Sequence, residues 1–286
     1  MKTGLIVEGG GMKCAYSAGV LDGFLDGKIA FDYVIGVSAG AANAASYLAG
    51  QRDRNHRFYT EHSKSPQYFG VKSFLTTGNL FGLDYIYGTL TEEGGGDPLD
   101  YDAMQKNPAE FEYPATDAET GKPVYFTKAD VSPHDYAAIK ATCALPVASK
   151  PVEISGRFYY DGGVSDSIPV GRALKKGCDR VVVLMSKPKG FRMEPQGQKA
   201  AYTLALHRYP KIVSALDHRH EVYNAQLDEV HRLEEEGRCM VFCPPNIASM
   251  GTYSVDTKLA EMLYKSGLYD YNESAQTLKD FIGGKV

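Results

Sequence analysis

The chain carries, at residues 33–49, the stretch YVIGVSAGAANAASYLA, in which a strand pattern changes to a helix pattern within one residue. Residues 33–37 are apolar and rich in β-branched side chains, whereas the alanine-rich residues 39–49 are strong helix formers. Ser38 lies at the junction, inside a G-x-S-x-G pattern at 36–40. Small residues there allow strand and helix to approach closely, and the turn presents the hydroxyl at the positive end of a helix. The stretch predicts a nucleophilic serine at Ser38, with a purely structural turn as the alternative.

A glycine-rich loop comes before this stretch, after an earlier strand pattern. Residues 5–7 are apolar, and the sequence EGGGMKC at 8–14 leads into a helix with apolar residues on one face. Strand, loop, helix, strand and helix in this order form a βαβα unit, which predicts a parallel sheet with helices on its faces. Because parallel neighbours end at the same edge of a sheet, we expect the glycine loop to lie beside Ser38.

The glycine loop has three interpretations. Consecutive glycines let backbone N–H groups point together and let a ligand approach closely, as a dinucleotide pyrophosphate or an oxyanion requires. A dinucleotide site needs an acidic residue at the far end of the second strand, but Asp32 precedes that strand. We therefore expect oxyanion donors next to Ser38. A nucleotide loop and a plain tight turn stay open as alternatives.

The rest of the chain continues the α/β pattern and adds a candidate carboxylate. Strand patterns lie at 112–115, 124–127, 152–154, 158–160, 181–184 and 240–243, and helical patterns lie between Pro210 and Gly237 and from 258 onward. The sequence DGG at 161–163 follows a strand, so Asp161 is a candidate partner for the serine. The downstream histidines would allow a serine–acid–histidine order, but we expect them to be solvated on a polar helix surface: His207, His218, His220 and His231.

Composition argues against several other classes of protein. The chain has 286 residues with a net charge of -4, and it lacks the basic excess of a nucleic-acid binder. Its five cysteines show no C-x-x-C spacing, so we expect neither a disulfide framework nor a metal site. No apolar run approaches the roughly 20 residues of a membrane span, and the run before Glu8 is too short for a signal peptide. We expect a single soluble, cytoplasmic domain over residues 1–286, of unknown oligomeric state.

Taken together, these motifs resemble those of the patatin-like phospholipases. The resemblance is carried by EGGGMK at 8–13, GVSAG at 36–40, ATCALP at 141–146 and DGG at 161–163, in this order and spacing. It implies a three-layer α/β/α fold with a mostly parallel sheet and a catalytic dyad of Ser38 and Asp161 without histidine or cofactor. It also implies hydrolysis of lipid acyl esters, with an oxyanion hole at Gly9, Gly10, Gly11 and Met12. Cys14 departs from the family, which usually has a glycine there.

The dyad sets a physical requirement on Asp161. A free aspartate has a pKa near 3.9 and is a weak base toward a hydroxyl, so partial desolvation must raise its proton affinity. Lys13 follows the glycine loop and is a candidate for supporting the oxyanion, with an exposed charge as the alternative.

The substrate is expected to meet the middle of the chain. Residues 63–102 are rich in aromatic side chains and glycines, which suits either a mobile cover over an acyl channel or ordinary core packing. We expect a phospholipase A or lysophospholipase with transient peripheral contact with lipid. The alternatives are a non-lipid esterase or acyltransferase, and, in another class, a non-catalytic nucleotide- or lipid-binding protein.

Overall fold

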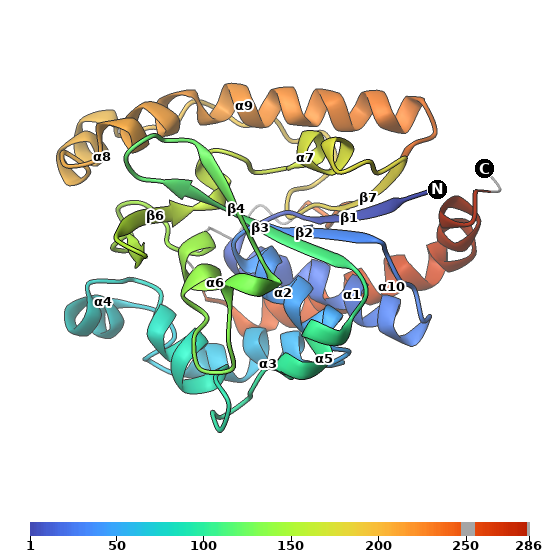
Figure 1. Ribbon diagram of the computed structural model, residues 1–286, viewed down its shortest axis with the longest axis horizontal. Helices are drawn as coiled ribbons and strands as arrows, with labels where there is room; N and C mark the ends of the chain where they lie inside the picture. The colour runs from blue at the N-terminus through green and yellow to red at the C-terminus, as the bar shows by residue number, and fades with distance from the viewer. Residues whose placement is uncertain (247–254, 285–286) are drawn as a thin grey trace.

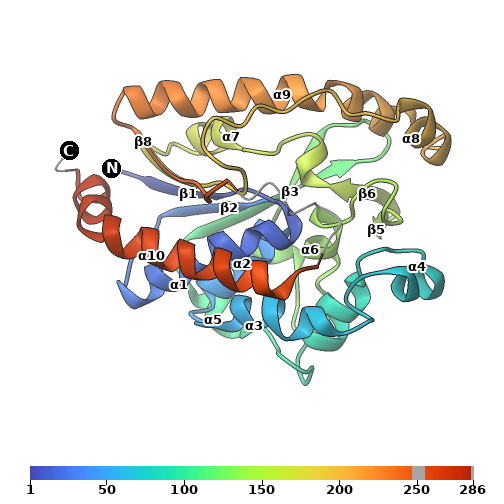
Figure 2. The same cartoon turned by 180° about the vertical axis from the view of Figure 1, so that it is seen from behind.

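A computed structural model describes residues 1–246 and 255–284 of the chain. Within these residues an eight-stranded sheet separates two layers of helices (Figures 1 and 2). One face of the sheet is covered by α1, α2, α3, α5 and α10, and the other face by α7 and α9. The expected three-layer α/β/α fold with a mostly parallel sheet is confirmed.

The sheet has a parallel centre and an antiparallel edge. Its strand order is β5-β6-β3-β2-β1-β7-β8, with β4 paired to β3 outside this path. Strands β3, β2, β1, β7 and β8 are parallel neighbours, whereas β4 and β6 pair with β3 in the antiparallel sense. The strands are β1 (Thr3–Val7), β2 (Tyr33–Gly36), β3 (Glu110–Asp117), β4 (Pro123–Thr127), β5 (Val152–Ile154), β6 (Arg157–Asp161), β7 (Arg180–Leu184) and β8 (Cys239–Phe242).

The helices range from single turns to two long helices near the C-terminus. The α-helices are α1 (Ala15–Asp26), α2 (Ala39–Leu48), α3 (Arg54–Thr60), α4 (Val71–Thr77), α5 (Tyr101–Lys106), α6 (Ala137–Thr142), α7 (Val170–Lys175), α8 (Lys199–Ala205), α9 (Pro210–Glu235) and α10 (Thr257–Ile282). Short 3-10 turns are η1 (Gly11–Cys14), η2 (His62–Lys64), η4 (Lys128–Asp130) and η5 (Gly162–Val164), and η3 (Tyr85–Leu90) is a π-helix.

The central strands are buried on both faces, which explains their nearly continuous apolar sequences. Side chains alternate between the faces, so Leu5 and Val7 of β1 pack toward α1 and α2 while Ile6 packs toward α7 and α9. The same alternation places Val182 and Leu184 of β7 in the first core. Burying each such side chain contributes about 1.5–3 kcal/mol.

The register of the central strands brings their carboxyl ends to one level. Val7 at the end of β1 pairs with Gly36 of β2 on one side and with Leu184 of β7 on the other. The segments that follow these strands therefore leave the sheet side by side, as expected for the glycine loop and Ser38. In Figure 1 the N-terminus marks the opposite end of the sheet, and α4, β6 and α8 gather at the end toward which β1 runs.

The later sequence patterns fold as predicted. Strands β3 and β4 pair around the turn at 119–121, and β5 and β6 form the hairpin around Ser155-Gly156. Pro210 begins α9, and Gly237 follows its end with a left-handed φ of 68°. The middle segment 63–102 contains η2, α4 and η3, which agrees with short helices covering one end of the sheet.

The contact between β1 and α2 requires a glycine at position 40. A methyl group built on Gly40 would lie 2.3 Å from the carbonyl oxygen of Val7. We predict that Gly40→Ala lowers the free energy of unfolding by about 1–3 kcal/mol, because the backbone cannot move aside. Gly171→Ala in α7 is the matched control: nothing lies within 4 Å of its methyl position, so stability should rise by about 0.4–1 kcal/mol. Urea unfolding of both variants measures this, and equal effects would contradict the close contact.

Candidate active site

A cavity of about 390 Å³ opens at the carboxyl edge of the sheet. Its wall contains the glycine loop, the Ser38 turn and Asp161, which come from the ends of β1, β2 and β6. The volume lies in the range of small-ligand sites. The structure therefore brings the predicted motifs to a single concave site.

Ser38 sits at a strained strand-to-helix turn. Its φ is 54° and its ψ is -131°, at the N-cap of α2. Such a conformation costs a non-glycine residue about 1–3 kcal/mol and is found at functional turns. The Ser38 amide donates a 3.0 Å hydrogen bond to Oγ1 of Thr142, a fully buried residue of α6. The side chain of Thr142, inside the 141–146 motif, thus fixes the turn.

Asp161 ends β6 and is almost completely buried. Its Oδ1 accepts a 2.7 Å hydrogen bond from the amide of Gly163, whereas its buried Oδ2 has no hydrogen-bond partner among the described residues. Burial raises the pKa of Asp161 to about 6, and the Ser38 hydroxyl, the Gly163 amide and the Arg219 charge act in the opposite direction. The carboxylate is therefore a stronger base than a solvated aspartate, and one oxygen remains free to accept a proton.

The glycine loop packs directly against the serine turn. A methyl group on Gly9 would lie 2.8 Å from Cβ of Ser38, so only glycine fits there. Gly11 has a left-handed φ of 56°. Within residues 1–246 and 255–284, the amides of Gly9, Gly10 and Gly11 donate no hydrogen bond to the protein. They are available to an oxyanion, as is the amide of Ala39, which begins α2 and lines the cavity.

A buried glutamate holds the loop in place. Glu8 accepts hydrogen bonds from the Tyr223 hydroxyl at 2.9 Å and from the Ser186 amide at 2.5 Å. The Ser186 hydroxyl in turn donates to the carbonyl oxygen of Gly9 at 2.7 Å. Lys187 lies 3.7 Å from Glu8 and lines the cavity. The loop after β7 therefore supports the glycine loop after β1.

Lys13 and Cys14 follow the glycine loop, and neither residue lines the cavity, whereas Lys187 does. Burial, followed by repulsion from Lys187, lowers the pKa of Lys13, yet Lys13 is not among the residues that line the cavity. The structure places Lys187, which the sequence did not single out, in the wall instead. Cys14 is fully buried, and its thiol donates to the carbonyl oxygen of Glu8 at 3.4 Å, so the helix accommodates the missing glycine.

The expectation for the histidines is right for three and wrong for one. His207, His218 and His231 are exposed, as predicted. His220, however, lines the cavity, and its Nδ1 is buried without a partner among the described residues. The reason is that α9 turns this part of its surface toward the site. No described hydrogen bond joins His220 to Ser38 or Asp161, so the contacts do not form a triad.

One wall of the cavity is apolar and aromatic. It is built from α3, the middle segment and the α6 region, with Phe58, Tyr59, Tyr68, Phe81, Leu83, Ile86, Tyr87, Leu99, Ile139 and Leu145. Phe81 is thus a cavity residue, whereas Phe74 is about half exposed on α4 and does not line the cavity. Part of the predicted substrate segment therefore faces the site, and part faces outward.

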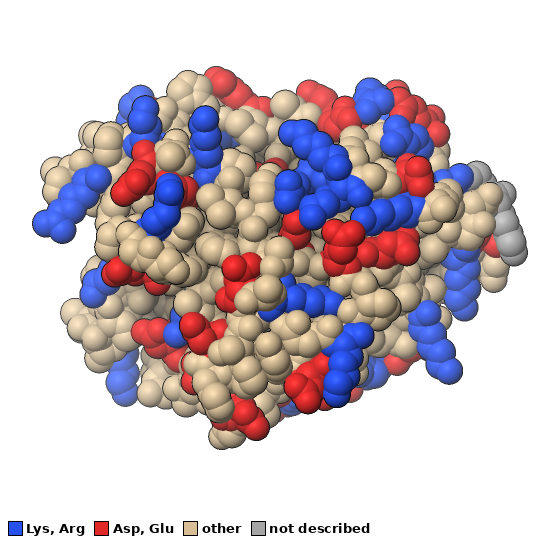
Figure 3. Space-filling model, in the orientation of Figure 1, with Lys and Arg blue, Asp and Glu red and all other residues tan. Residues whose placement is uncertain are grey.

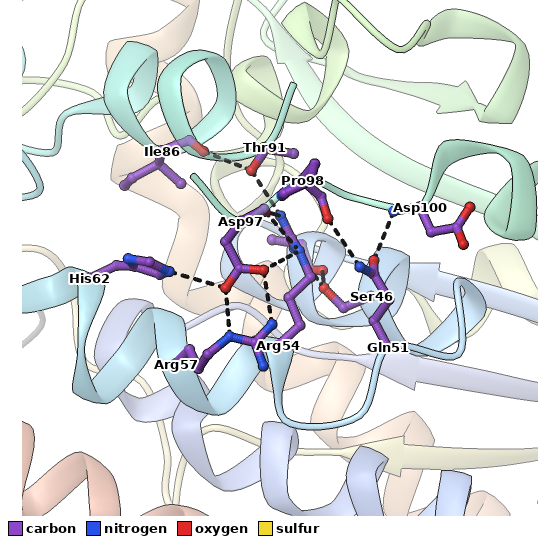
Figure 4. Close-up of polar contacts among 11 residues, drawn as sticks. Ser46, Gln51, Arg54, Arg57, His62, Ile86, Thr91, Asp97, Pro98 and Asp100 are labelled. Atoms are coloured by element: carbon purple, nitrogen blue, oxygen red, sulfur yellow. Dashed lines mark hydrogen bonds and ion pairs between the residues drawn. The ribbon is translucent and has the colours of Figure 1, made fainter. Parts of the chain in front are cut away.

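A buried arginine anchors the second half of that segment (Figure 4). Arg54 of α3 donates to the carbonyl oxygen of Asp97 at 2.8 Å and to the Thr91 hydroxyl at 3.0 Å. The Asp97 carboxylate is held by Arg57 and His62 at 2.7 and 3.0 Å. Burial lowers the pKa of Arg54 to about 10. This network fixes Thr91 and Asp97 to α3 and to His62.

The described residues contain neither a candidate metal site nor a membrane-spanning helix. Among the described residues, no three histidine, cysteine, aspartate or glutamate side chains are grouped so as to hold a metal ion. Within the same ranges, every helix is too short or too polar to cross a membrane.

The fold and the site define a class of protein: an α/β protein with a serine at a strand-to-helix elbow, next to a glycine loop and a buried carboxylate. The family model named Patatin-like phospholipase matches residues 5–174, more than half of the chain. The chain therefore belongs to the patatin-like phospholipase family. A second model, a domain of unknown function (DUF6363), matches residues 209–283, which run from the start of α9 to the end of α10.

Individual relatives share parts of the chain. The Escherichia coli protein named Uncharacterized protein YjjU is 29% identical over 197 residues, which cover 67% of this chain and 54% of that protein. An uncharacterized NTE family protein of Mycobacterium tuberculosis is 35% identical over 82 residues, covering 29% of this chain and 22% of that protein. The crystal structure of VipD from Legionella pneumophila aligns with a TM-score of 0.40 and 14% identity, over 93% of this chain and 67% of that one. The chain spans about half the length of YjjU.

The raised pKa of Asp161 predicts a pH dependence of activity. If ionised Asp161 is the base, kcat/KM for an ester should fall about tenfold per pH unit below about pH 6. An acid limb near pH 4, as for a solvated carboxyl, would contradict this assignment.

The same pKa predicts a stability effect that needs no catalysis. Since the folded-state pKa is raised, the protein gains stability from this carboxyl below about pH 3.8 and loses it as the pH rises through about 6. Asp161→Asn stays neutral, so between pH 4 and pH 8 it should gain roughly 2.4 kcal/mol in unfolding free energy relative to the parent. Urea unfolding across this range measures the difference, and a constant difference would contradict the shift.

Proposed function

We propose that the protein hydrolyses acyl esters of lipids through a dyad of Ser38 and Asp161. One observation carries this proposal: the buried Oδ2 of Asp161 has no hydrogen-bond partner among the described residues and lies in the same cavity as the strained Ser38. A buried carboxylate without its full set of partners costs stability unless it has another use. Accepting the proton of the Ser38 hydroxyl is such a use.

The proposed reaction has two acyl-transfer steps. Asp161 removes the proton from Ser38 as Oγ attacks the ester carbonyl carbon. The carbonyl oxygen of the ester then carries the negative charge as an oxyanion. The free amides of the glycine loop stabilise this charge together with the amide of Ala39. The intermediate collapses, the protonated Asp161 gives its proton to the leaving alkoxide, and an acyl-serine remains. Water then repeats the sequence, with Asp161 as base, and releases the acid. Transfer to an alcohol in place of water would give the acyltransferase alternative.

The walls and the surroundings of the cavity support a lipid substrate. The aromatic wall suits an acyl chain, since each methylene group transferred from water gains about 0.8 kcal/mol. Large apolar side chains are exposed nearby on Val71, Phe74 and Leu75 of α4, on Phe158 of β6 and on Leu204 of α8. These three elements lie at the same end of the molecule in Figures 1 and 2. Such exposed groups favour transient peripheral contact with a lipid surface, and α4 remains the proposed mobile cover.

Surface charge fits the same proposal. On the face shown in Figure 3, basic and acidic side chains are interspersed, and a group of lysines and arginines in the upper half borders a group of acidic residues. A net charge of -4 with this mixture supports a contact driven by apolar burial more than by charge, and it does not suit a nucleic-acid partner.

Acyl-chain length tests the lipid substrate. We predict that the protein prefers octanoyl over acetyl esters of p-nitrophenol, and that Ser38→Ala hydrolyses neither. Phe81→Ser removes part of the cavity wall and should lower kcat/KM for the octanoyl ester roughly tenfold, with little effect on the acetyl ester. Phe74→Ser is the matched control: it should keep the chain-length preference on dissolved esters and slow only the reaction on phospholipid vesicles. Equal loss on both esters in Phe81→Ser, or a preference for acetyl in the parent, would overturn the lipid assignment.

A further inference from the structure

Helix α9 presents a charged residue on its buried face, directly above the site. The face toward the sheet carries Ile212, Leu216, Tyr223, Leu227 and Val230, all buried. Leu216 and Tyr223 are seven positions apart, and Arg219 lies between them on the same face. Arg219 is partly buried and lines the cavity. A long, flexible cation at a core-facing position calls for a partner.

That partner is the turn that carries Asp161. Nε of Arg219 donates a 2.6 Å hydrogen bond to the carbonyl oxygen of Gly163. Seven residues along α9, Gln226 donates to Asp166 at 2.5 Å and accepts from the amide of Ile168 at 2.9 Å. These contacts hold Gly163 of the DGG motif and two residues that follow the motif, so α9 fixes the segment between β6 and α7.

The guanidinium of Arg219 also faces the carboxyl group. A methyl group built on Gly163 would lie 3.1 Å from Oδ1 of Asp161 and 3.5 Å from Nη2 of Arg219, so the position of Gly163 separates the two charges. They are joined by no described hydrogen bond. The positive charge acts across this gap and opposes the effect of burial on the pKa of Asp161. Gly163 keeps the gap narrow because it has no side chain.

The same helix reaches the other half of the site. Tyr223, four residues after Arg219, donates to Glu8, which through Ser186 supports the carbonyl of Gly9. Arg219 and Tyr223, one turn apart on the same face of α9, therefore contact the turn that carries Asp161 and the glutamate that supports the glycine loop.

We propose that α9 belongs to the active site, with Arg219 as the positioning residue that fixes the Asp161–Gly163 turn and faces the Asp161 carboxyl group with a positive charge. This gives a role to the beginning of the segment matched by the domain of unknown function. It rests on the proposed dyad. Arg219 does not touch the reacting atoms; it acts through Asp161, and Tyr223 acts through Glu8.

The other titratable groups around Asp161 must be separated from Arg219 in any test. Besides Arg219, the titratable or charged side chains that act on Asp161 or line its cavity are Glu8, Cys14, Arg54, Tyr59, Tyr68, Tyr87, Cys143, Lys187, Glu194 and His220. His220 is the neighbour of Arg219 on α9 and lines the same cavity. A variant of His220 is therefore a necessary companion.

The test compares pH profiles of kcat/KM for a short-chain ester in Arg219→Gln and Arg219→Lys. Glutamine keeps a donor for Gly163 but removes the charge, whereas lysine keeps the charge and loses the guanidinium geometry. We expect the acid limb of Arg219→Gln to move to higher pH. The loss of kcat/KM relative to the parent should therefore be roughly ten times larger at pH 5 than at pH 9. Arg219→Lys should keep the limb of the parent and lose activity by the same factor at every pH.

Two controls assign the shift to Arg219. Arg232→Met removes the same charge from the far, exposed end of α9 and should leave the acid limb in place. His220→Asn should also keep the limb, which excludes His220 as the titrating group. A uniform loss in Arg219→Gln, without a shift of the limb, would overturn the proposal and leave Arg219 a purely structural contact. A shift in His220→Asn as large as in Arg219→Gln would overturn it as well.

A second readout separates this proposal from the proposed function. The pH dependence of unfolding free energy, measured for Arg219→Gln with and without Asp161→Asn, reports the titration of Asp161 without any substrate. The charge-free variant should move this titration to higher pH. If the parent hydrolyses no ester, the proposed function fails while this measurement still decides the role of Arg219. If the parent is active and the titration does not move, only the role of Arg219 fails.

Discussion

Backbone contact between the end of β1 and the start of α2 is the constraint on which the site depends. Gly40 packs against the carbonyl of Val7, and Gly9 packs against Cβ of Ser38, both closer than any side chain would allow. This contact fixes the glycine loop beside the serine before any other group is considered. It also forces the left-handed φ at Ser38, because the chain must reverse from strand to helix within one residue. Thr142 stabilises this strained turn, because its hydroxyl oxygen accepts a hydrogen bond from the Ser38 amide.

The second feature of the site is the buried carboxylate of Asp161, in which only one of the two oxygens accepts a hydrogen bond from the described residues. Burying Asp161 costs stability at neutral pH. The protein limits that cost with one amide hydrogen bond and with the charge of Arg219, and it keeps one carboxylate oxygen free. Full pairing would lower the pKa and weaken the base, and complete isolation would leave the group protonated. Gly163 keeps the carboxylate of Asp161 and the guanidinium of Arg219 near each other without a described hydrogen bond between them, which is intermediate between full pairing and isolation. The long helix α9 packs on the sheet through its apolar side chains. The same packing places Arg219 next to the turn that carries Asp161.

Local sequence patterns predicted most of the fold because each reports a local cause. The patterns that identify these elements depend on neighbouring residues only: the apolar runs of β1 and β7, the G-x-S-x-G turn, the hairpin glycine and Pro210 at the start of α9. Arg54, Lys187, Arg219 and His220 were missed or misjudged as site residues because their roles depend on how distant helices and loops pack. A signal was present for Arg219 and His220, since the apolar spacing on α9 is interrupted between Leu216 and Tyr223. For Arg54 the sequence offered no comparable signal, because a short polar helix with two arginines predicts solvated charges.

Covalent labelling of Ser38 by a fluorophosphonate tests the dyad most directly, because only an activated serine reacts. The folded protein is incubated with the probe at pH 8, digested, and the modified peptide is identified by mass spectrometry. The dyad predicts a single adduct on Ser38, no adduct in Ser38→Ala, and labelling slowed by at least about a hundredfold in folded Asp161→Asn. An unlabelled Ser38 in the folded parent, or labelling of Asp161→Asn at the parent's rate, would contradict it.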